Sequence, residues 1–348
     1  MLTKKFILGG VEVKSGTTVA INIELPKLYN TPTHLPVSVI RGKRDGPTIF
    51  VSAAIHGDEL NGIEIIRRLK KLNLLKKLKG TLILVPVVNV YGMMNLSRYL
   101  PDRRDLNRSF PGSSKGSLAG RIAKIFFDEI VSKCSLGIDL HTAAIHRSNL
   151  PQIRTNIKSE HTLMLAKAFE APVVLHSELR DGSLRSEAQE IGVPVLLYEA
   201  GEALRFDEKS IKIGVKGVIN VLKALNMLPE TKKKFHANPL ILNKSSWVRA
   251  LDSGMLRTIK ALGDMVKKDE IIAFIDKPLS EKSFVLRAQY DGIIIGKSQI
   301  PLVQEGDAVF HIANNDNSFI ANEYIDNFQD ASLEHSNITE LNAEYDIE

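Results

Sequence analysis

Uninterrupted apolar runs alternate with stretches of helical periodicity along most of the chain, and this alternation most constrains the fold. Strands that read as continuous apolar runs are typical of sheets that helices cover on both sides. We therefore predict an α/β fold with a mixed, largely parallel sheet and helices on both faces. The predicted strands cover 35–54 (two strands around the turn "GKRDGP"), 80–90, 136–142, 171–176 and 193–201, and the predicted helices cover 63–75, 117–133 and 159–169.

In sheets of this kind, ligands bind at the carboxyl ends of the strands. His56, His141 and Glu199 all stand at the ends of predicted strands. This common placement indicates that residues far apart in the sequence meet at one edge of the sheet.

Length and composition set the class of protein. At 348 residues the chain can form two domains, or one large domain with an appendage. No apolar run approaches the ~18 residues of a membrane span, and "FIL" near the start is too short for a secretory leader. The single cysteine, Cys134, cannot form an internal disulfide, which fits a reducing compartment. We predict a cytoplasmic protein without a membrane segment; a homo-oligomer is compatible with the sequence.

The net charge of +6 is unevenly distributed. Residues 314–348 carry nine acidic residues and no Lys or Arg, so the rest of the chain carries about +15 (6 + 9). Much of this positive charge lies in "RRLKKLNLLKKLKG", residues 67–80, where the lysines take the face opposite an apolar stripe. We interpret this as a solvated helix face, because no nucleic-acid-binding motif accompanies it. No nucleic-acid partner is predicted, and an acidic substrate fits the charge balance.

The sequence changes character after Leu228-Pro229. Two stretches, 253–275 and 291–313, each combine a Gly, a β-rich run, Gly-Asp and a closing strand, as in the half-repeats of lipoyl- and biotinyl-type sandwich barrels. The connection between them lacks a tight hairpin that presents a lysine, so we interpret this region as a structural domain or a lid. The predicted divisions are a main domain with an N-terminal β extension (1–228), a linker (229–246), an all-β barrel-sandwich domain (247–313) and an acidic tail (314–348).

The segment "VSAAIHGDELNG", residues 51–62, brings His56 and Glu59 out of an apolar strand. Residues three apart on a helical turn face the same way, so both side chains can reach one metal ion. The alternative is structural: Gly57 forms a turn, Asp58 caps the next helix, and His56 is only hydrogen-bonded.

A second strand ends on a histidine in "GIDLHTA". His141 can be a metal ligand, and Asp139 can orient a neighbouring metal ligand without binding the metal itself. Two histidines and one glutamate form the open three-ligand set of catalytic zinc, which leaves a position for water. His146 and His176 are alternative ligands.

Two further motifs carry polar groups suited to a substrate. The segment "SRYLPDRRDLNRSFPG", residues 97–112, contains Asn107-Arg108, whose amide and planar fork suit a carboxylate. Glu199 in "LLYEAGE" ends an apolar strand, and its partly desolvated carboxylate suits a general base. Glu202 is the nearest alternative base.

The motifs "HGDE", "DLNRSFPG", "DLHT" and "EAG", in this order, resemble the succinylglutamate desuccinylase/aspartoacylase family of the zinc carboxypeptidase clan, over residues 35–225. The resemblance implies one zinc per chain, a catalytic base, and a pair of residues that bind the substrate carboxylate. These roles correspond to His56, Glu59 and His141 for zinc, Glu199 for the base, and Asn107 and Arg108 for the carboxylate.

The resemblance also implies catalytic or substrate-binding roles for two more arginines. An Arg-Tyr pair polarises the scissile carbonyl in aspartoacylases, and Arg98-Tyr99 matches it. The segment up to Asp105 is longer here, which leaves Arg103 and Arg104 as competitors for this role. Arg185 is the nearest match to a further substrate arginine.

The sequence thus predicts a zinc-dependent hydrolase that removes an acyl group from a small, anionic N-acyl amino acid, with Glu199 and Arg98 as catalytic residues. One alternative is a metallocarboxypeptidase, which applies the same chemistry to peptides. The other is a non-catalytic carrier or ligand-binding protein built on the C-terminal β region. The acyl group and the amino acid are not specified by any motif.

Overall fold

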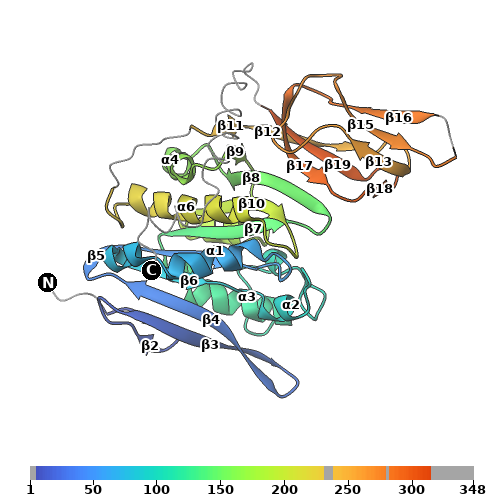
Figure 1. Ribbon diagram of the computed structural model, residues 1–348. Helices are drawn as coiled ribbons and strands as arrows, with labels where there is room; N and C mark the ends of the chain where they lie inside the picture. Colours follow the sequence, from blue (N-terminus) through green and yellow to red (C-terminus); the bar gives the residue numbers. More distant parts are fainter. Residues whose placement is uncertain (1–4, 231–237, 280–281, 315–348) are drawn as a thin grey trace.

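The computed structural model describes residues 5–230, 238–279 and 282–314 (Figure 1). The predicted acidic tail lies outside the described residues except for Asn314, and so does part of the predicted linker. None of the helices in the described part of the chain has the length and apolarity that a membrane span needs.

A 13-stranded sheet runs through the described structure, and its centre is parallel. The order β6–β5–β7–β10 joins strands Lys79–Val85, Arg44–Ala53, Leu136–Ala143 and Val195–Glu202, all in parallel register. These four strands match the predicted apolar runs.

The strands next to this centre pair antiparallel, and parallel pairing returns at two edge strands, β9 (Val173–His176) and β11 (Leu240–Leu242). The prediction of a largely parallel sheet is therefore correct for the centre and for this edge only. On one side lie β4 (Thr31–Arg41) and β3 (Thr18–Leu28), joined by a tight turn. On the other side β8 (Arg147–Thr155) follows β7 after a short loop and pairs antiparallel with β10. Short connections favour antiparallel pairing, because a parallel pair needs a long crossover.

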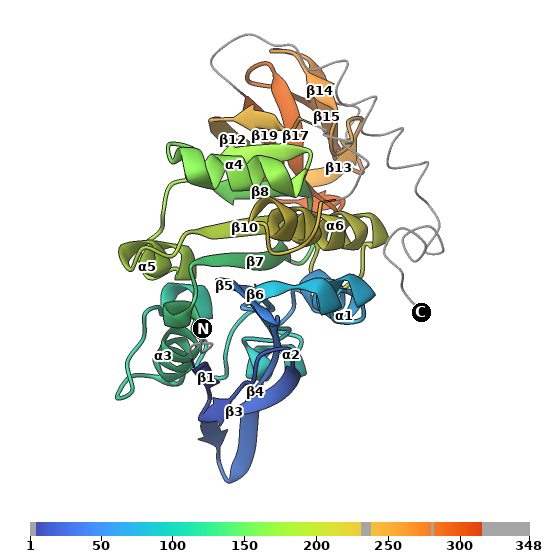
Figure 2. The same cartoon turned by 90° about the vertical axis from the view of Figure 1, so that its left-hand side faces the viewer.

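Helices cover both faces of the sheet, as predicted (Figure 2). Neighbouring residues of a strand point to opposite faces, and Val51 and Phe50 of β5 accordingly belong to two separate apolar cores. The core around Val51 includes α1 (Asn61–Lys70), α4 (Glu160–Phe169) and α6 (Glu208–Ala224), and the core around Phe50 includes α2 (Val90–Met94), α3 (Leu118–Glu129) and α5 (Leu184–Glu190). Shorter elements are β1 (Ile7–Leu8), β2 (Val11–Glu12) and the 3₁₀ turns η1 (Asn73–Lys77), η2 (Leu106–Arg108) and η3 (Val131–Lys133).

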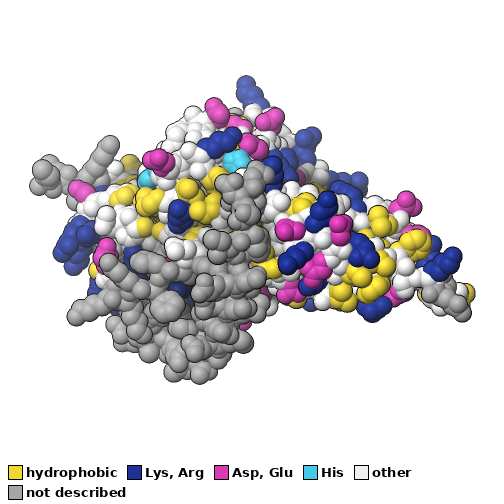
Figure 3. Space-filling model, turned by 90° about the horizontal axis from the view of Figure 1, so that it is seen from above, with side chains coloured by type: hydrophobic (Ala, Val, Ile, Leu, Met, Phe, Trp, Pro, Cys, Tyr) yellow, Lys and Arg dark blue, Asp and Glu magenta, His cyan; other side chains and the backbone are white. Residues whose placement is uncertain are grey.

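Residues 244–314, which we call the C-terminal β unit, form two layers around their own apolar core. One layer continues the large sheet and the other is a separate four-stranded sheet. On the face in Figure 3, basic and acidic side chains are interspersed over this unit. The first layer contains β12 (Lys244–Arg249), β14 (Met265–Val266), β17 (Gly292–Ser298) and β19 (Ala308–Asn314), and the second contains β13 (Gly254–Thr258), β15 (Ile271–Asp276), β16 (Ser283–Arg287) and β18 (Leu302–Val303).

The C-terminal β unit is joined to the rest of the sheet by backbone hydrogen bonds. Strand β17 of the unit pairs antiparallel with β8. Just before the unit begins, β11 (Leu240–Leu242) pairs parallel with β9 (Val173–His176). The predicted linker, residues 229–246, therefore contains strand β11 and the start of β12.

Candidate active site

A cavity of about 280 Å³ lies at the carboxyl edge of the central strands. Its lining includes the eight residues that the sequence favoured as metal ligands, base or substrate-binding groups, although these residues come from segments far apart along the chain. Parallel strands end at the same edge, which is why separations of 80 residues and more along the chain close into one site.

The loop after β5 shapes the first part of this site. Strand β5 ends at Ala53, and a Cβ atom on Gly57 would lie 2.0 Å from the backbone of Gly92, so no side chain fits there. This close contact with α2 holds the loop that carries His56 and Glu59. The prediction that Asp58 caps the next helix is wrong: the N-cap is Leu60, without a side-chain cap. Asp58 is buried, and its Oδ1 makes no hydrogen bond within the described structure.

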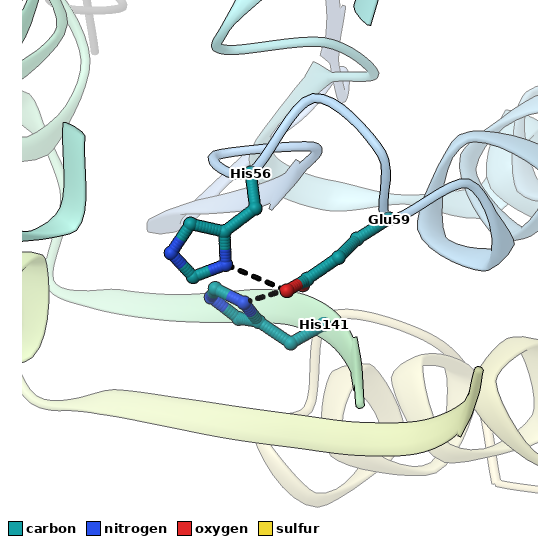
Figure 4. A group of neighbouring side chains, drawn as sticks. All are labelled: His56, Glu59 and His141. Carbon is teal, nitrogen blue, oxygen red and sulfur yellow. Dashed lines mark hydrogen bonds and ion pairs between the residues drawn. The ribbon is translucent and has the colours of Figure 1, made fainter. Parts of the chain in front are cut away.

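His56, Glu59 and His141 form one cluster (Figure 4). Nδ1 of His56 lies 2.6 Å from Oε1 of Glu59, and Nδ1 of His141 lies 2.8 Å from Oε2 of the same carboxylate. The candidate ligand atoms of the three residues all lie within 4.8 Å of one another. The alternatives lie elsewhere: His146 is exposed, and His176 contacts Glu178.

Carboxylates hold the outer nitrogens of both histidines. Nε2 of His141 lies 2.7 Å from Asp139, which in turn accepts a hydrogen bond from the Ser52 hydroxyl. Nε2 of His56 lies 3.2 Å from Asp105. Such outer carboxylates orient metal-binding imidazoles and raise their basicity. The sequence indicated Asp139 for this position, but not Asp105.

The electrostatics of this cluster suit a cation. Burial opposes the charged form of His56 and of His141, but the neighbouring carboxylates outweigh it and raise the pKa of both histidines. Burial raises the pKa of Glu59, whereas the charges and hydrogen bonds of the histidines lower it more strongly, so its pKa lies well below its usual range. Carboxylates face all four ring nitrogens, an arrangement that favours the doubly protonated form of both rings when no metal is bound. A metal ion can replace the two inner protons, and the donor set of two imidazoles and one carboxylate fits zinc.

Of the three arginines that compete for the upstream role, the structure places Arg98 in the cavity. Its Nη2 donates to Asp105 at 3.0 Å, and its Nη1 lies 3.4 Å from Glu59. Arg103 and Arg104 are exposed and do not belong to the cavity lining among the described residues.

The predicted carboxylate-binding residues also face the cavity. The backbone N–H of Leu184 donates to Oδ1 of Asn107 at 2.9 Å, so the amide nitrogen of Asn107 is its donor for a ligand. Arg108 donates to the backbone carbonyl of Asn107. Arg185 donates through Nη2 to the Ser177 hydroxyl at 3.0 Å.

Glu199 lies opposite the cluster on the neighbouring strand, where its Cα pairs in parallel register with that of His141. Its carboxylate is largely buried and accepts a hydrogen bond of 2.6 Å from the amide of Asn149, while Nη1 of Arg154 lies 3.9 Å away. Glu202, the alternative base, accepts from the backbone of His146 instead and does not line the cavity among the described residues.

Several lining residues escaped the sequence analysis, among them Asn149 and Arg154 on β8, and Trp247 on β12. Strand β8 was not predicted, so its side chains were not placed. The ring of Trp247 is stacked on His311, with centroids 4.6 Å apart, and Arg147 lies over it at 5.1 Å. Trp247 brings the C-terminal β unit into the wall of the cavity.

Comparisons with known proteins find relatives of this chain in sequence and in fold. The chain is 29% identical over 293 residues to the N-alpha-acetyl-L-2,4-diaminobutyric acid deacetylase of Halomonas elongata. The match covers 80% of this chain and 85% of the relative. The fold matches a product-bound structure of the ectoine utilization protein EutE from Ruegeria pomeroyi, with a TM-score of 0.78 and 24% identity over 86% of this chain and 95% of that one. It also matches a succinylglutamate desuccinylase/aspartoacylase from Rhodobacter sphaeroides, with a TM-score of 0.76 and 24% identity over 86% and 96% of the two chains.

The sequence profile of the succinylglutamate desuccinylase/aspartoacylase catalytic domain matches residues 45–225, slightly more than half of the chain. This span contains the entire His-Glu-His cluster and Glu199. The chain therefore belongs to the succinylglutamate desuccinylase/aspartoacylase family.

Proposed function

We propose that the protein is a zinc-dependent deacylase that hydrolyses the amide bond of a small, anionic N-acyl amino acid. The observation that carries this proposal is the cluster of His56, Glu59 and His141 beside Glu199 in one cavity. The name of the Halomonas elongata relative, a deacetylase of an N-acetylated amino acid, supports the same reaction class.

In this proposal the three clustered residues hold the zinc ion. When bound, zinc supplies a Lewis acid that polarises a carbonyl group and lowers the pKa of water toward ~7. Asp139 and Asp105 keep the outer histidine nitrogens protonated and the rings fixed.

Glu199 acts as the general base and then as the general acid. The amide of Asn149 donates a hydrogen bond to Oε2 of Glu199. Oε1 is therefore the atom that takes a proton from the attacking water and passes it to the leaving amine. The guanidinium of Arg98 stabilises the negative charge that builds on the carbonyl oxygen. Asn107 and Arg108 bind the carboxylate of the substrate.

The charges around the cavity favour an anionic substrate. Six arginines line it, against three carboxylates: Glu59, Asp139 and Glu199. Burial lowers the pKa of Arg185 to about 10, and the neighbouring positive charge of Arg154 contributes to this shift. A substrate with a free side-chain amine, such as that named for the Halomonas elongata relative, adds a like charge to this site. We infer that acidic N-acyl amino acids are preferred over basic ones.

A substrate screen tests this function. The zinc-loaded protein is assayed with N-acetyl, N-succinyl and N-formyl derivatives of aspartate, glutamate, alanine and diaminobutyrate, with dipeptides alongside. We expect amino acid release from the acylated acidic amino acids and weak release from the diaminobutyrate derivatives. Release from dipeptides alone would identify a carboxypeptidase instead. Tight binding without turnover of any compound would identify a ligand-binding protein.

A further inference from the structure

Strand β8 lies between the strand that carries Glu199 and the C-terminal β unit (Figures 1 and 2). At Asn149 the backbone of β8 pairs with Gly201 of β10 on one side and with Gly296 of β17 on the other. A single residue of β8 thus joins the C-terminal β unit to the segment of β10 next to Glu199.

The side chain of Asn149 makes the same connection. Its amide nitrogen donates to Oε2 of Glu199 at 2.6 Å, and an ionised carboxylate only accepts, so the amide has one orientation. In that orientation Oδ1 faces Gly296, where a Cβ atom would lie 3.0 Å away. The side chain is buried, and a Cβ atom at position 296 would press on it and on Cβ of His311, which would also lie 3.0 Å away.

A second contact fixes the two strands against each other. Gln152, whose Cα pairs with that of Glu199, donates from its fully buried amide to the backbone carbonyl of Ile295 at 3.2 Å. Apolar residues of β8 and β17, Leu150 and Ile295 among them, share one small core. The position of β17 is therefore transmitted to Asn149 by packed groups on both sides.

We propose that Asn149 is a positioning residue for Glu199 and that the C-terminal β unit, through Gly296, holds Asn149 in place. The proposal rests on Glu199 as the base of the proposed reaction. It gives the C-terminal β unit a role in turnover itself, in addition to shaping the cavity.

The kinetic test compares Asn149→Ala and Asn149→Asp with the wild-type zinc-loaded protein. Aspartate keeps the size of the side chain, and in its ionised form it has no proton to donate to Glu199. We expect kcat to fall on the order of ten- to a hundred-fold in both variants, with KM changed by less than about twofold, because misplacing a catalytic group acts on the chemical step. In the Glu199→Gln background, Asn149→Ala should change kcat by less than about twofold, since the residue acts through Glu199. A wild-type kcat in either single variant, or an equal fall in the Glu199→Gln background, overturns the proposal.

Gly296→Ala tests the contribution of the C-terminal β unit from a residue that does not itself line the cavity. The added methyl group should displace the Asn149 amide and lower kcat in the same way, non-additively with Asn149→Ala. Lys297→Ala, on the next residue of β17, is the matched control and should keep the wild-type kcat. Equal activity of the Gly296→Ala and Lys297→Ala variants would contradict the proposed link.

A spectroscopic readout separates this proposal from the proposed function. The side-chain amide signal of Asn149, assigned in ¹⁵N NMR spectra by its loss in Asn149→Ala, should shift in Glu199→Gln and in Gly296→Ala but not in Lys297→Ala. These shifts do not depend on turnover. Inactivity of the wild-type protein on every substrate, with the shifts present, refutes the function alone; absence of the shifts refutes the link between β17, Asn149 and Glu199.

Discussion

Glu59 is the most heavily bonded side chain of the site. Its two oxygens face His56 and His141, the backbone N–H of Thr142 donates to it at 3.0 Å, and Arg98 lies within 3.4 Å. A buried carboxylate needs such partners, because an unpaired charge in the interior is very costly. A metal ion held by the same atoms provides this compensation without two protonated histidines.

We predict that the purified protein holds about one zinc ion per chain. His56→Ala and His141→Ala should each abolish metal retention, because two remaining ligands bind weakly. Asp139→Ala removes only the outer partner of His141, and should weaken the metal affinity by about 10- to 100-fold. Elemental analysis after dialysis and competition with a chelator measure these effects. His176→Ala, which lies outside the cluster, is the control; unchanged metal content in both ligand variants would place the metal elsewhere.

Glu199→Gln separates a catalyst from a ligand. Glutamine keeps the shape but does not accept the proton, so kcat should fall by on the order of a hundred-fold or more while zinc content and substrate binding stay close to wild type. Loss of zinc in this variant would instead make Glu199 a metal ligand.

Glu202→Gln provides the control for this experiment, because Glu202 is the nearest other carboxylate of the same strand and bonds the backbone of His146. It should retain most of the wild-type kcat. If Glu202→Gln loses turnover and Glu199→Gln does not, Glu202 activates the water.

At the scale of elements, the central apolar strands were predictable from the sequence, and the polar strand β8 was not. The central strands are buried on both faces, so their sequences are continuous apolar runs, and the histidines and Glu199 follow from where those runs end. Strand β8 has the sequence "RSNLPQIRT", with polar residues that face the cavity and Pro151, which cannot donate to a ladder. Nothing in that local pattern indicates a strand, so Asn149 and Arg154 could not be placed.

Helices α1 and α6 are tied together by an ion-pair network. Glu64 accepts from Arg67 at 2.5 Å and from Arg68 at 2.7 Å, and Arg68 also pairs with Glu208 of α6 at 2.7 Å. Hydrogen bonds from Arg67, with further help from Arg68, lower the pKa of Glu64 to about 2. The basic helix face that the sequence showed is thus partly paired.

We predict that Glu64→Gln lowers the free energy of unfolding by about 1–2 kcal/mol at pH 7. The carboxylate has a lower pKa in the folded state than in the unfolded one, so its contribution is fully present above the unfolded pKa of ~4.3 and is lost as pH falls toward 2. Urea unfolding should therefore show nearly the same difference between variant and wild type at pH 7 and pH 5, and a smaller difference at pH 3.5. Glu190→Gln, on an exposed residue at the end of α5, is the control. A difference that is constant with pH would mean that the effect is not electrostatic.

At the scale of the whole molecule, the C-terminal β unit and the main sheet form one continuous structure. The sequence showed two half-repeats and a change to short strands and turns after Leu228-Pro229, and these features predict a separate β domain. It did not show that β17 would hydrogen-bond to β8, because pairing between strands about 150 residues apart has no local signal. The same long-range pairing brings Trp247 to the cavity.

Because Trp247 lines the cavity, the C-terminal β unit limits the size of the accepted substrate together with the main sheet. Its ring is parallel to that of His311, with 8° between the planes, and Arg147 covers the ring at 5.1 Å, so it forms a rigid wall. Trp247→Ala should enlarge the cavity and raise kcat/KM for a hexanoyl amino acid relative to its acetyl analogue by about tenfold, because about two of the four extra methylenes then enter the new space and each contributes ~0.8 kcal/mol. Trp247→Phe keeps a ring in place and should change this ratio far less. The ratio is measured with one amino acid under both acyl groups, so that effects on folding and metal content cancel. An unchanged ratio in Trp247→Ala would show that the wall which limits the acyl group lies in the main sheet, and that the C-terminal β unit does not set substrate size.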